Sequence, residues 1–202
     1  MSNKLVLIGL ILVIIVISGC NVNIEINPSS QDVEEQQAAQ KQTESQTVQE
    51  QTQSREEKIA ADDANYDLAI QSNDPSFCEK IQLNGIKRDE CFYEIAVQTN
   101  DFSICGNIKL ISHKKNDCYL EIALARQNPS ICVNIESDLK KEDCYEKLAI
   151  LLKDHTLCQN VEERKVFCYN EVAIQKKDVS ICDNLDKQAD IDQCESMYYA
   201  VY

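Results

Sequence analysis

Cysteines at a regular spacing constrain this chain more than any other feature. The stretch CYLEIALARQNPSIC, residues 118–132, begins and ends with cysteine, and related stretches cover residues 91–105, 144–158 and 168–182. Similar units recur about every 26 residues from Ala64 onward. A repeat of this length predicts a small helical unit that is stable only when it stacks against its neighbours.

The apolar pattern within each unit predicts a helix. With the opening cysteine counted as position zero, apolar residues recur at positions one, four, five and six, and position five is always alanine. An aromatic residue stands at position one or two. This spacing puts apolar groups on more than one side of an α-helix, so neighbours must cover the helix on two sides.

Position ten predicts where a second helix begins. It holds Asp or Asn, followed two residues later by Ser or Thr, with proline between them at Pro75 and Pro129. Asp or Asn as N-cap and Pro at the first helical position are start signals. The second helix carries the next cysteine and, three residues later, an aliphatic residue that keeps it on the core. The predicted caps are Asp74, Asp101, Asn128, Asp154 and Asp178, and the aliphatic residues are Ile81, Ile108, Ile135, Val161 and Leu185.

The cysteine spacing also predicts which thiols pair. The step across the opening stretch is constant at 14 residues, whereas the steps between one stretch and the next are 13, 13, 12, 10 and 12. The midpoints of these variable steps are mostly polar, and Asn84 with Gly85 suits a tight turn. Pairing across the constant step would leave Cys78 and Cys194 single, because Ala64 replaces the first cysteine. The predicted bridges are Cys78–Cys91, Cys105–Cys118, Cys132–Cys144, Cys158–Cys168 and Cys182–Cys194.

The N-terminal sequence predicts export. Residues 5–17, LVLIGLILVIIVI, are uninterrupted apolar sequence after Lys4, as in a secretory signal. The run ends in ISGC, Ile17–Cys20, which resembles the lipobox of prokaryotic lipoproteins. The resemblance implies that Cys20 is acylated and becomes the first mature residue. The alternative is an uncleaved membrane helix, although sixteen residues reach only about 24 Å across a hydrocarbon core of ~30 Å. Both place the rest of the chain outside the cytoplasm and anchored to the membrane, where the other cysteines oxidise.

Three parts follow from these patterns: a signal peptide over residues 1–19, a low-complexity tether over 20–61 and a repeat domain over 62–202. Residues 28–58 have no aromatic residue and no glycine, so they bury too little surface to offset the entropy of ordering. A coiled coil is the alternative, but Val33 and Val48 are too sparse for a heptad seam. The predicted fold class is all-α, with a disordered tether before an α-solenoid of about five short helical hairpins. In general design this is similar to Sel1-like and tetratricopeptide repeat proteins.

The sequence offers little for catalysis. Gly85 and Gly106 are the glycines outside the signal, so no phosphate-binding loop can be built. His155 as a base for Cys158 is conceivable, but Cys158 fits the disulfide pattern. Zinc held by cysteines of adjacent units would require a reducing compartment. We therefore predict a protein that is not an enzyme and that has no cofactor and no metal.

The function predicted is that of a cell-surface, membrane-anchored module that binds proteins or peptides or serves as a scaffold. A formal net charge of -14 disfavours nucleic acid. Positions three, seven and ten of the first helix lie on one face and are mostly acidic or amide residues, so stacked units would line them up as an acidic and amide ladder. The hypothetical binding residues of this ladder, for a basic partner, are Glu94, Glu121 and Glu171. A face kept polar for solubility is the alternative. The C-terminal SMYYAVY is expected to cap the stack, or else to form a docking patch. A structural envelope protein and a secreted enzyme or enzyme inhibitor are the alternative functions.

Overall fold

The computed structural model describes residues 30–201, with side chains from residue 48 onward. The predicted signal peptide, the lipobox and Cys20 lie outside the described residues. The chain divides into two parts, residues 1–49 and 50–202, and the description below concerns the second unless stated otherwise. Every described element is a helix, which confirms the all-α class. None of these described helices is long and apolar enough to cross a membrane.

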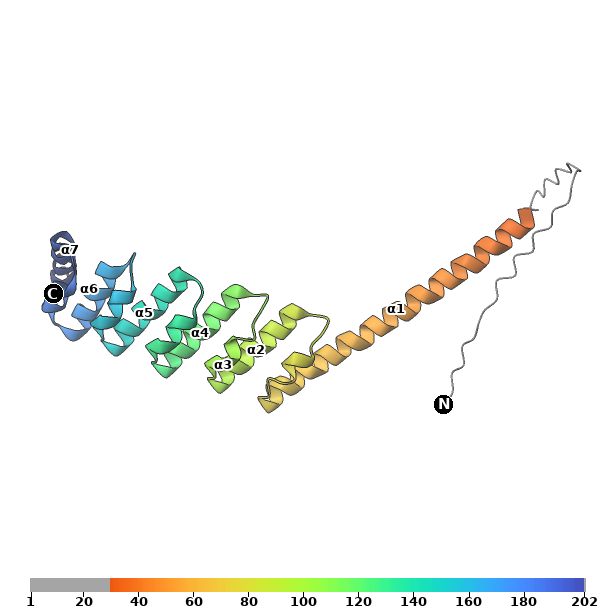
Figure 1. Cartoon of the computed structure of the whole chain (residues 1–202), viewed down its shortest axis with the longest axis horizontal. Coiled ribbons are helices and arrows are strands. Elements are labelled where there is room, and N and C mark those ends of the chain that lie inside the picture. The colour runs from red at the N-terminus through yellow and green to blue at the C-terminus, as the bar shows by residue number, and fades with distance from the viewer. Residues whose placement is uncertain (1–29, 202) are drawn as a thin grey trace, which may run out of the picture. The chain divides into compact units, whose positions relative to one another are not determined.

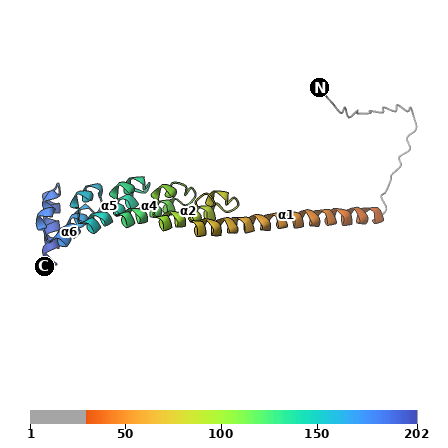
Figure 2. The same ribbon diagram turned by 90° about the horizontal axis from the view of Figure 1, so that it is seen from below.

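Long and short helices alternate along the chain (Figure 1). The long helices are α1 (Ser30–Ser72), α2 (Gly85–Thr99), α4 (Ser112–Arg126), α5 (Asp138–Leu152), α6 (Lys165–Lys176) and α7 (Gln188–Tyr199). The short ones are η1 (Cys78–Lys80), α3 (Phe102–Cys105), η2 (Pro129–Asn134), η3 (His155–Asn160) and η4 (Val179–Asn184). A long helix and the short helix after it form one unit. From α2 onward, consecutive long helices pack against each other, and both views show the units side by side in chain order (Figure 2).

The second helix of each unit is shorter than a hairpin of two α-helices would require. Apart from the four-residue α3, the second helices are 3₁₀ helices of three or six residues. The residue that ends each 3₁₀ helix is extended, for example Ile135 with φ -75° and ψ 122°. The side chain of this extended residue is buried in the core, as is the cysteine three residues before it.

The structure corrects the expectation of a flexible tether over the residues that it describes. Residues 30–61 belong to helix α1 instead of forming an irregular coil. Side chains 48–61 are all exposed, so packing within residues 50–202 does not explain the helix there. The explanation is local: Gln, Glu, Ala, Lys and Arg are strong helix formers, and no Gly or Pro interrupts them after Pro28.

The five predicted disulfides are confirmed. Each joins the short helix of one unit to the long helix of the next, with Cα–Cα distances between 5.6 and 5.8 Å. All ten bridged cysteines are fully buried. The alanines of position five are also fully buried, which lets the bridged segments approach the helices closely.

The long helices α1, α2, α4, α5 and α6 end in the same way. The residue at position nine adopts the left-handed conformation, with φ between 51° and 56°, at Asn73, Asn100, Gln127, Lys153 and Lys177. In α2, the N–H of Asp101 donates to the carbonyl of Ala96 (2.8 Å) and that of Asn100 to Val97 (3.1 Å). This is the Schellman arrangement, which satisfies the last carbonyls of a helix. It reverses the chain within two residues and brings position ten to the start of the short helix.

Candidate interaction surface

Four of the five caps predicted at position ten are formed, whereas the N-cap residue of η1 is Phe77 and Asp74 bonds only within the turn before that helix. The side chains of Asp74, Asp101, Asn128, Asp154 and Asp178 each accept a hydrogen bond from the backbone N–H two residues later, at 2.9 to 3.1 Å. Hydrogen bonds from Thr156 and from Ser180 lower the pKa of Asp154 and of Asp178 below the usual value. The backbone N–H of Ser76 does the same for the pKa of Asp74. Position ten therefore contributes to folding whether or not it contacts a partner.

Two of the three hypothetical binding residues already have a partner inside the chain. The hydroxyl of Tyr93 donates to Glu121 at 2.6 Å, from the preceding unit. Tyr66 forms the equivalent hydrogen bond to Glu94. Burial makes the largest contribution to the raised pKa of Tyr66, and the hydrogen bond to Glu94 makes the next largest. Position three has no capping role, but in these two units the structure gives it another role, as the acceptor for a tyrosine of the preceding unit.

Glu171, the third hypothetical binding residue, is half-buried on α6. It lies near Glu146 of the preceding unit, whose pKa is raised chiefly by burial and slightly by the charge of Glu171. Arg164 forms an ion pair with Glu146 at 3.1 Å and opposes that rise. The three glutamates thus occupy equivalent positions on three helices, but their surroundings differ.

Ion pairs add a second contact between consecutive units. A lysine four residues before the opening cysteine pairs with an acid one residue before the equivalent position of the preceding unit. The pairs are Lys87 with Asp63, Lys114 with Glu90 (2.9 Å) and Lys140 with Asp117 (2.8 Å). Lys87 and Lys114 also lie over the rings of Tyr66 and Tyr93, at 5.2 and 5.4 Å. Acid, tyrosine, lysine and glutamate therefore form a repeated contact between units.

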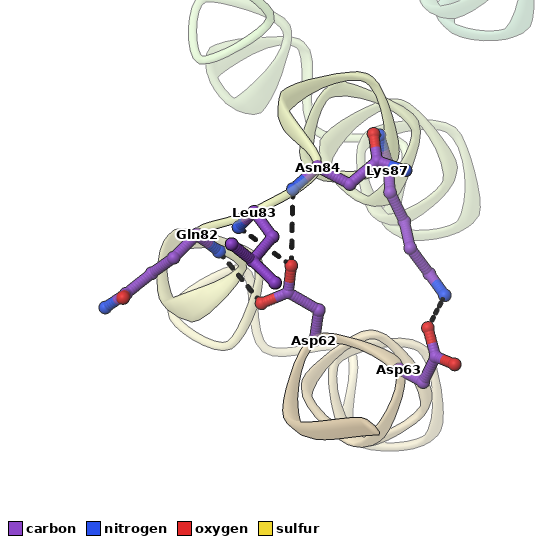
Figure 3. Close-up of polar contacts among 6 residues, drawn as sticks. All are labelled: Asp62, Asp63, Gln82, Leu83, Asn84 and Lys87. Atoms are coloured by element: carbon purple, nitrogen blue, oxygen red, sulfur yellow. Dashed lines mark hydrogen bonds and ion pairs between the residues drawn. The ribbon is translucent and has the colours of Figure 1, made fainter. Parts of the chain in front are cut away.

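Acid and amide side chains that were not predicted from the sequence hold the loops between units. Asp62 on α1 accepts the backbone N–H groups of Gln82, Leu83 and Asn84 at 2.9, 2.9 and 3.3 Å (Figure 3). Figure 3 also shows the neighbouring Asp63 turned toward Lys87 instead. Asp62 lies two residues before the opening position, and Asp89, Asn116 and Glu142 at the equivalent positions bind the loops that follow them. The signal in the sequence was an acid or amide recurring two residues before position zero.

The structure does not support His155 as a base that activates the thiol of Cys158. Cys158 is bonded to Cys168, so no thiol is available for His155 to activate. The ring of His155 instead lies 6.3 Å from that of Tyr169. The described residues contain no group of three or more metal-ligating side chains. One hollow of about 390 Å³ is lined by Val133, Lys141, Tyr145, Gln159, Asn160 and Glu162, and it lies between η2, α5 and η3.

The C-terminal segment is divided between the core and the surface. Tyr198 is half-buried against the cluster that contains Cys182 and Cys194, which suits a cap. Tyr199 is 63% exposed and meets Tyr198 edge to face at 5.4 Å. Cys194 is the only residue of α7 that is buried.

Aliphatic side chains project at the loops between units. Leu83, Ile86 and Leu110 are 48%, 57% and 63% exposed. Leu110 lies directly against Gly85, because a Cβ on that glycine would come within 2.5 Å of the Leu110 Cδ1. The side chain of Leu110 from one loop therefore packs on the backbone at the start of α2, beside the preceding loop.

Comparison with known proteins adds no relative to this description. No protein-family model matches the chain, and neither curated proteins nor solved structures show a significant match to it.

Proposed function

We propose that the chain is an extracytoplasmic, membrane-anchored helical-repeat protein that acts as a protein-binding or scaffold module. Its repeat domain would be an α-solenoid of about five short hairpins. The observation that carries the proposal is the set of five buried disulfides, each between consecutive units. Disulfides of this kind persist in oxidising compartments, and stacked helical units expose extended surfaces suited to protein partners.

The membrane anchor is tested at Cys20. Mass spectrometry of the mature protein should find a lipid on Cys20 and no residue before it. Cys20→Ser should leave the signal unprocessed and the lipid absent. An intact N-terminus in the native protein would favour the uncleaved membrane helix and overturn the lipoprotein proposal.

The binding role is tested on intact cells. Crosslinking through surface lysines, followed by purification of the chain, should recover a specific extracytoplasmic protein. Recovery of the chain alone at every crosslinker length would overturn the binding proposal and favour a structural envelope protein.

The acidic and amide ladder remains the proposed contact for a basic partner. The tyrosine hydrogen bonds to Glu94 and Glu121 determine which control variant the test needs. Changing Glu94, Glu121 and Glu171 to lysine should abolish salt-sensitive capture of the crosslinked partner. The same changes remove the tyrosine hydrogen bonds, so a second variant is required. Tyr66→Phe with Tyr93→Phe removes those bonds without changing the charge, and it should leave capture intact. Loss of capture in both variants would assign Glu94 and Glu121 to contact between units alone.

A further inference from the structure

The contact between α5 and α6 differs from the earlier contacts between long helices. The disulfide that precedes α6, Cys158–Cys168, spans 10 residues, the shortest separation of the five. Helix α6 has 12 residues, whereas α4 and α5 each have 15. The buried apolar core also divides at α5, where one cluster ends at Leu148 and the next begins at Ala149. The core of the repeat domain therefore consists of two parts that meet at α5.

Two glutamates replace the tyrosine hydrogen bond at this contact. At two earlier contacts, a tyrosine at position two donates to a glutamate at position three of the next unit, as Tyr93 does to Glu121. The same positions hold Glu146 on α5 and Glu171 on α6. Glu146 is only 5% exposed, so water hydrates its charge poorly. An ionised Glu146 therefore meets a like charge where those two contacts have a hydrogen bond.

Arg164 is the cation that faces Glu146. It stands four residues before position zero, as Lys87 does in α2, and the cations at this position in the earlier units pair with an acid one residue before position zero of the preceding unit. On α5 that acid is Asp143, which pairs with Lys147 at 2.8 Å. Arg164 pairs with Glu146 instead, at 3.1 Å, and its side chain is 55% exposed. Because solvent weakens a pair with an exposed partner, Arg164 offsets only part of the cost of burying this carboxylate.

The charged groups on the other elements against α5 act elsewhere. Asp117 of α4 is paired with a lysine of α5 at 2.8 Å. The charge of His155 on η3 acts on the capping residues Asp154 and Asp178. The sequence of η2 contains no acidic or basic residue. The charge balance at the contact between α5 and α6 therefore depends chiefly on Glu146, Glu171 and Arg164.

We infer that the contact between α5 and α6 is a pH-sensitive joint, which is tighter in mild acid than at neutral pH. A proton on Glu146 removes both the buried charge and its repulsion with Glu171. Because burial raises the pKa of Glu146, the folded protein takes up this proton at a higher pH than the unfolded chain does. Stability therefore rises as the pH falls through the folded pKa, until the pH reaches the unfolded value of about 4.3.

Two variants of Glu146 test the joint by urea unfolding of the full chain with its disulfides intact. Glu146→Gln has no charge at any pH. The stability of the wild type relative to this variant should rise as the pH falls from about 7 to about 5, by up to about tenfold in the unfolding equilibrium for each unit by which folding raises the pKa. Glu146→Tyr restores the tyrosine of the earlier contacts, which can donate to Glu171, so it should remove the pH dependence.

Glu121→Gln is the matched control. Glu121 occupies the same position as Glu171 but accepts a hydrogen bond from a tyrosine instead of facing a carboxylate. The stability of the wild type relative to Glu121→Gln should therefore stay constant over the same pH range. A change equal to that seen with Glu146→Gln would show that the pH dependence does not belong to the contact between α5 and α6, and it would overturn the inference.

Hydrogen exchange locates the effect within the wild type and does not depend on how well the variants fold. After correction for the intrinsic pH dependence of exchange, the amides of α6 should be better protected at about pH 5 than at about pH 7, whereas those of α2 should be equally protected. Equal protection of α6 at both pH values would overturn the inference. Lower protection of α6 in acid would also overturn it, because the pair with Arg164 would then outweigh the cost of the buried charge.

Discussion

Single residues end the long helices that precede α7 in a conformation that most side chains avoid. Lys177, with φ 55°, follows the last residue of α6 and occupies the left-handed position of the Schellman arrangement. Glycine is the usual residue there because it has no Cβ to clash with the following carbonyl. Lys177 adopts this strained conformation, which places the next residue at the N-cap of the short helix η4.

Lys177→Gly is expected to stabilise the protein by about 1 kcal/mol, because it relieves the left-handed strain. Lys176→Gly is the matched control: the same residue type, also exposed, but in the right-handed conformation one position earlier. It should destabilise by about 0.5–1 kcal/mol. Urea unfolding with the disulfides intact measures both changes. Equal losses in the two variants would contradict the strain at Lys177.

The caps predict a loss of stability in acid. The folded-state pKa of Asp154 lies below its unfolded value, so the ionised carboxylate favours folding. This stability is present above the usual pKa of about 3.9 and is lost as the pH falls through the lower folded value. The stability of the wild type relative to Asp154→Asn should therefore shrink below about pH 4. Urea unfolding over this pH range measures it.

Asn128 provides the converse test of the caps, because it already caps its short helix as an amide. Asn128→Asp adds a titrating cap, so this variant should lose more stability in acid than the wild type. A pH profile identical to that of the wild type would show that the capping carboxylates do not govern acid unfolding.

At the scale of elements, each loop is held by a side chain from the helix before it. Asp89 on α2 is fully buried and accepts the N–H groups of Lys109, Leu110 and Ile111 at 3.1, 2.6 and 2.9 Å. Hydrogen bonds to an ionised acceptor are the strong kind, and a buried N–H without a partner is costly. The loop conformation therefore depends on a contact about 20 residues away in sequence.

Asp89→Ala is expected to cost about 3 kcal/mol, since three partly buried N–H groups lose their acceptor. Asp89→Asn should cost less, because an amide oxygen can accept one bond, as Asn116 does from Glu136. Hydrogen exchange should speed up at the amides of residues 109–111 in the alanine variant. Unchanged exchange there would show that the loop is held by other contacts.

At the scale of the repeat domain, disulfides and stacking are linked. All the bridges are fully buried, so a reductant reaches them only when the structure opens. Stacked units open most easily at their ends, where a unit has one neighbour. The C-terminal end should open more easily than the middle of the domain, because α7 buries only Cys194 whereas α4 buries six residues.

Mild reduction without denaturant is expected to open Cys182–Cys194 first and Cys105–Cys118 and Cys132–Cys144 much later. Alkylation of the released thiols at successive times, followed by peptide mass spectrometry, gives the order. The fully denatured protein is the control, in which the five bridges should reduce at similar rates. Simultaneous reduction of all five in the native protein would indicate one cooperative unit without fraying.

Much of this architecture could be predicted from the sequence, because it depends on residues close together in the chain. The spacing of the cysteines determined the disulfide partners, and Asp or Asn at position ten determined the caps. Local propensity also governs α1, where the helix-forming Gln, Glu and Ala outweigh the chain entropy that favours a disordered tether.

Contacts between units could not be predicted in the same way. Whether Glu94 is an exposed binding residue or a partner of Tyr66 depends on how closely two helices stack, and no periodicity reports that distance. The role of Asp62 and the exposed cluster around Leu110 likewise depend on which loop lies beside which helix. The sequence by itself therefore determined the unit and its bridges, because these follow from short-range spacing. Only the tertiary structure decided which polar side chains hold units together and which remain for a partner, because that choice is made by packing between residues more than 20 apart.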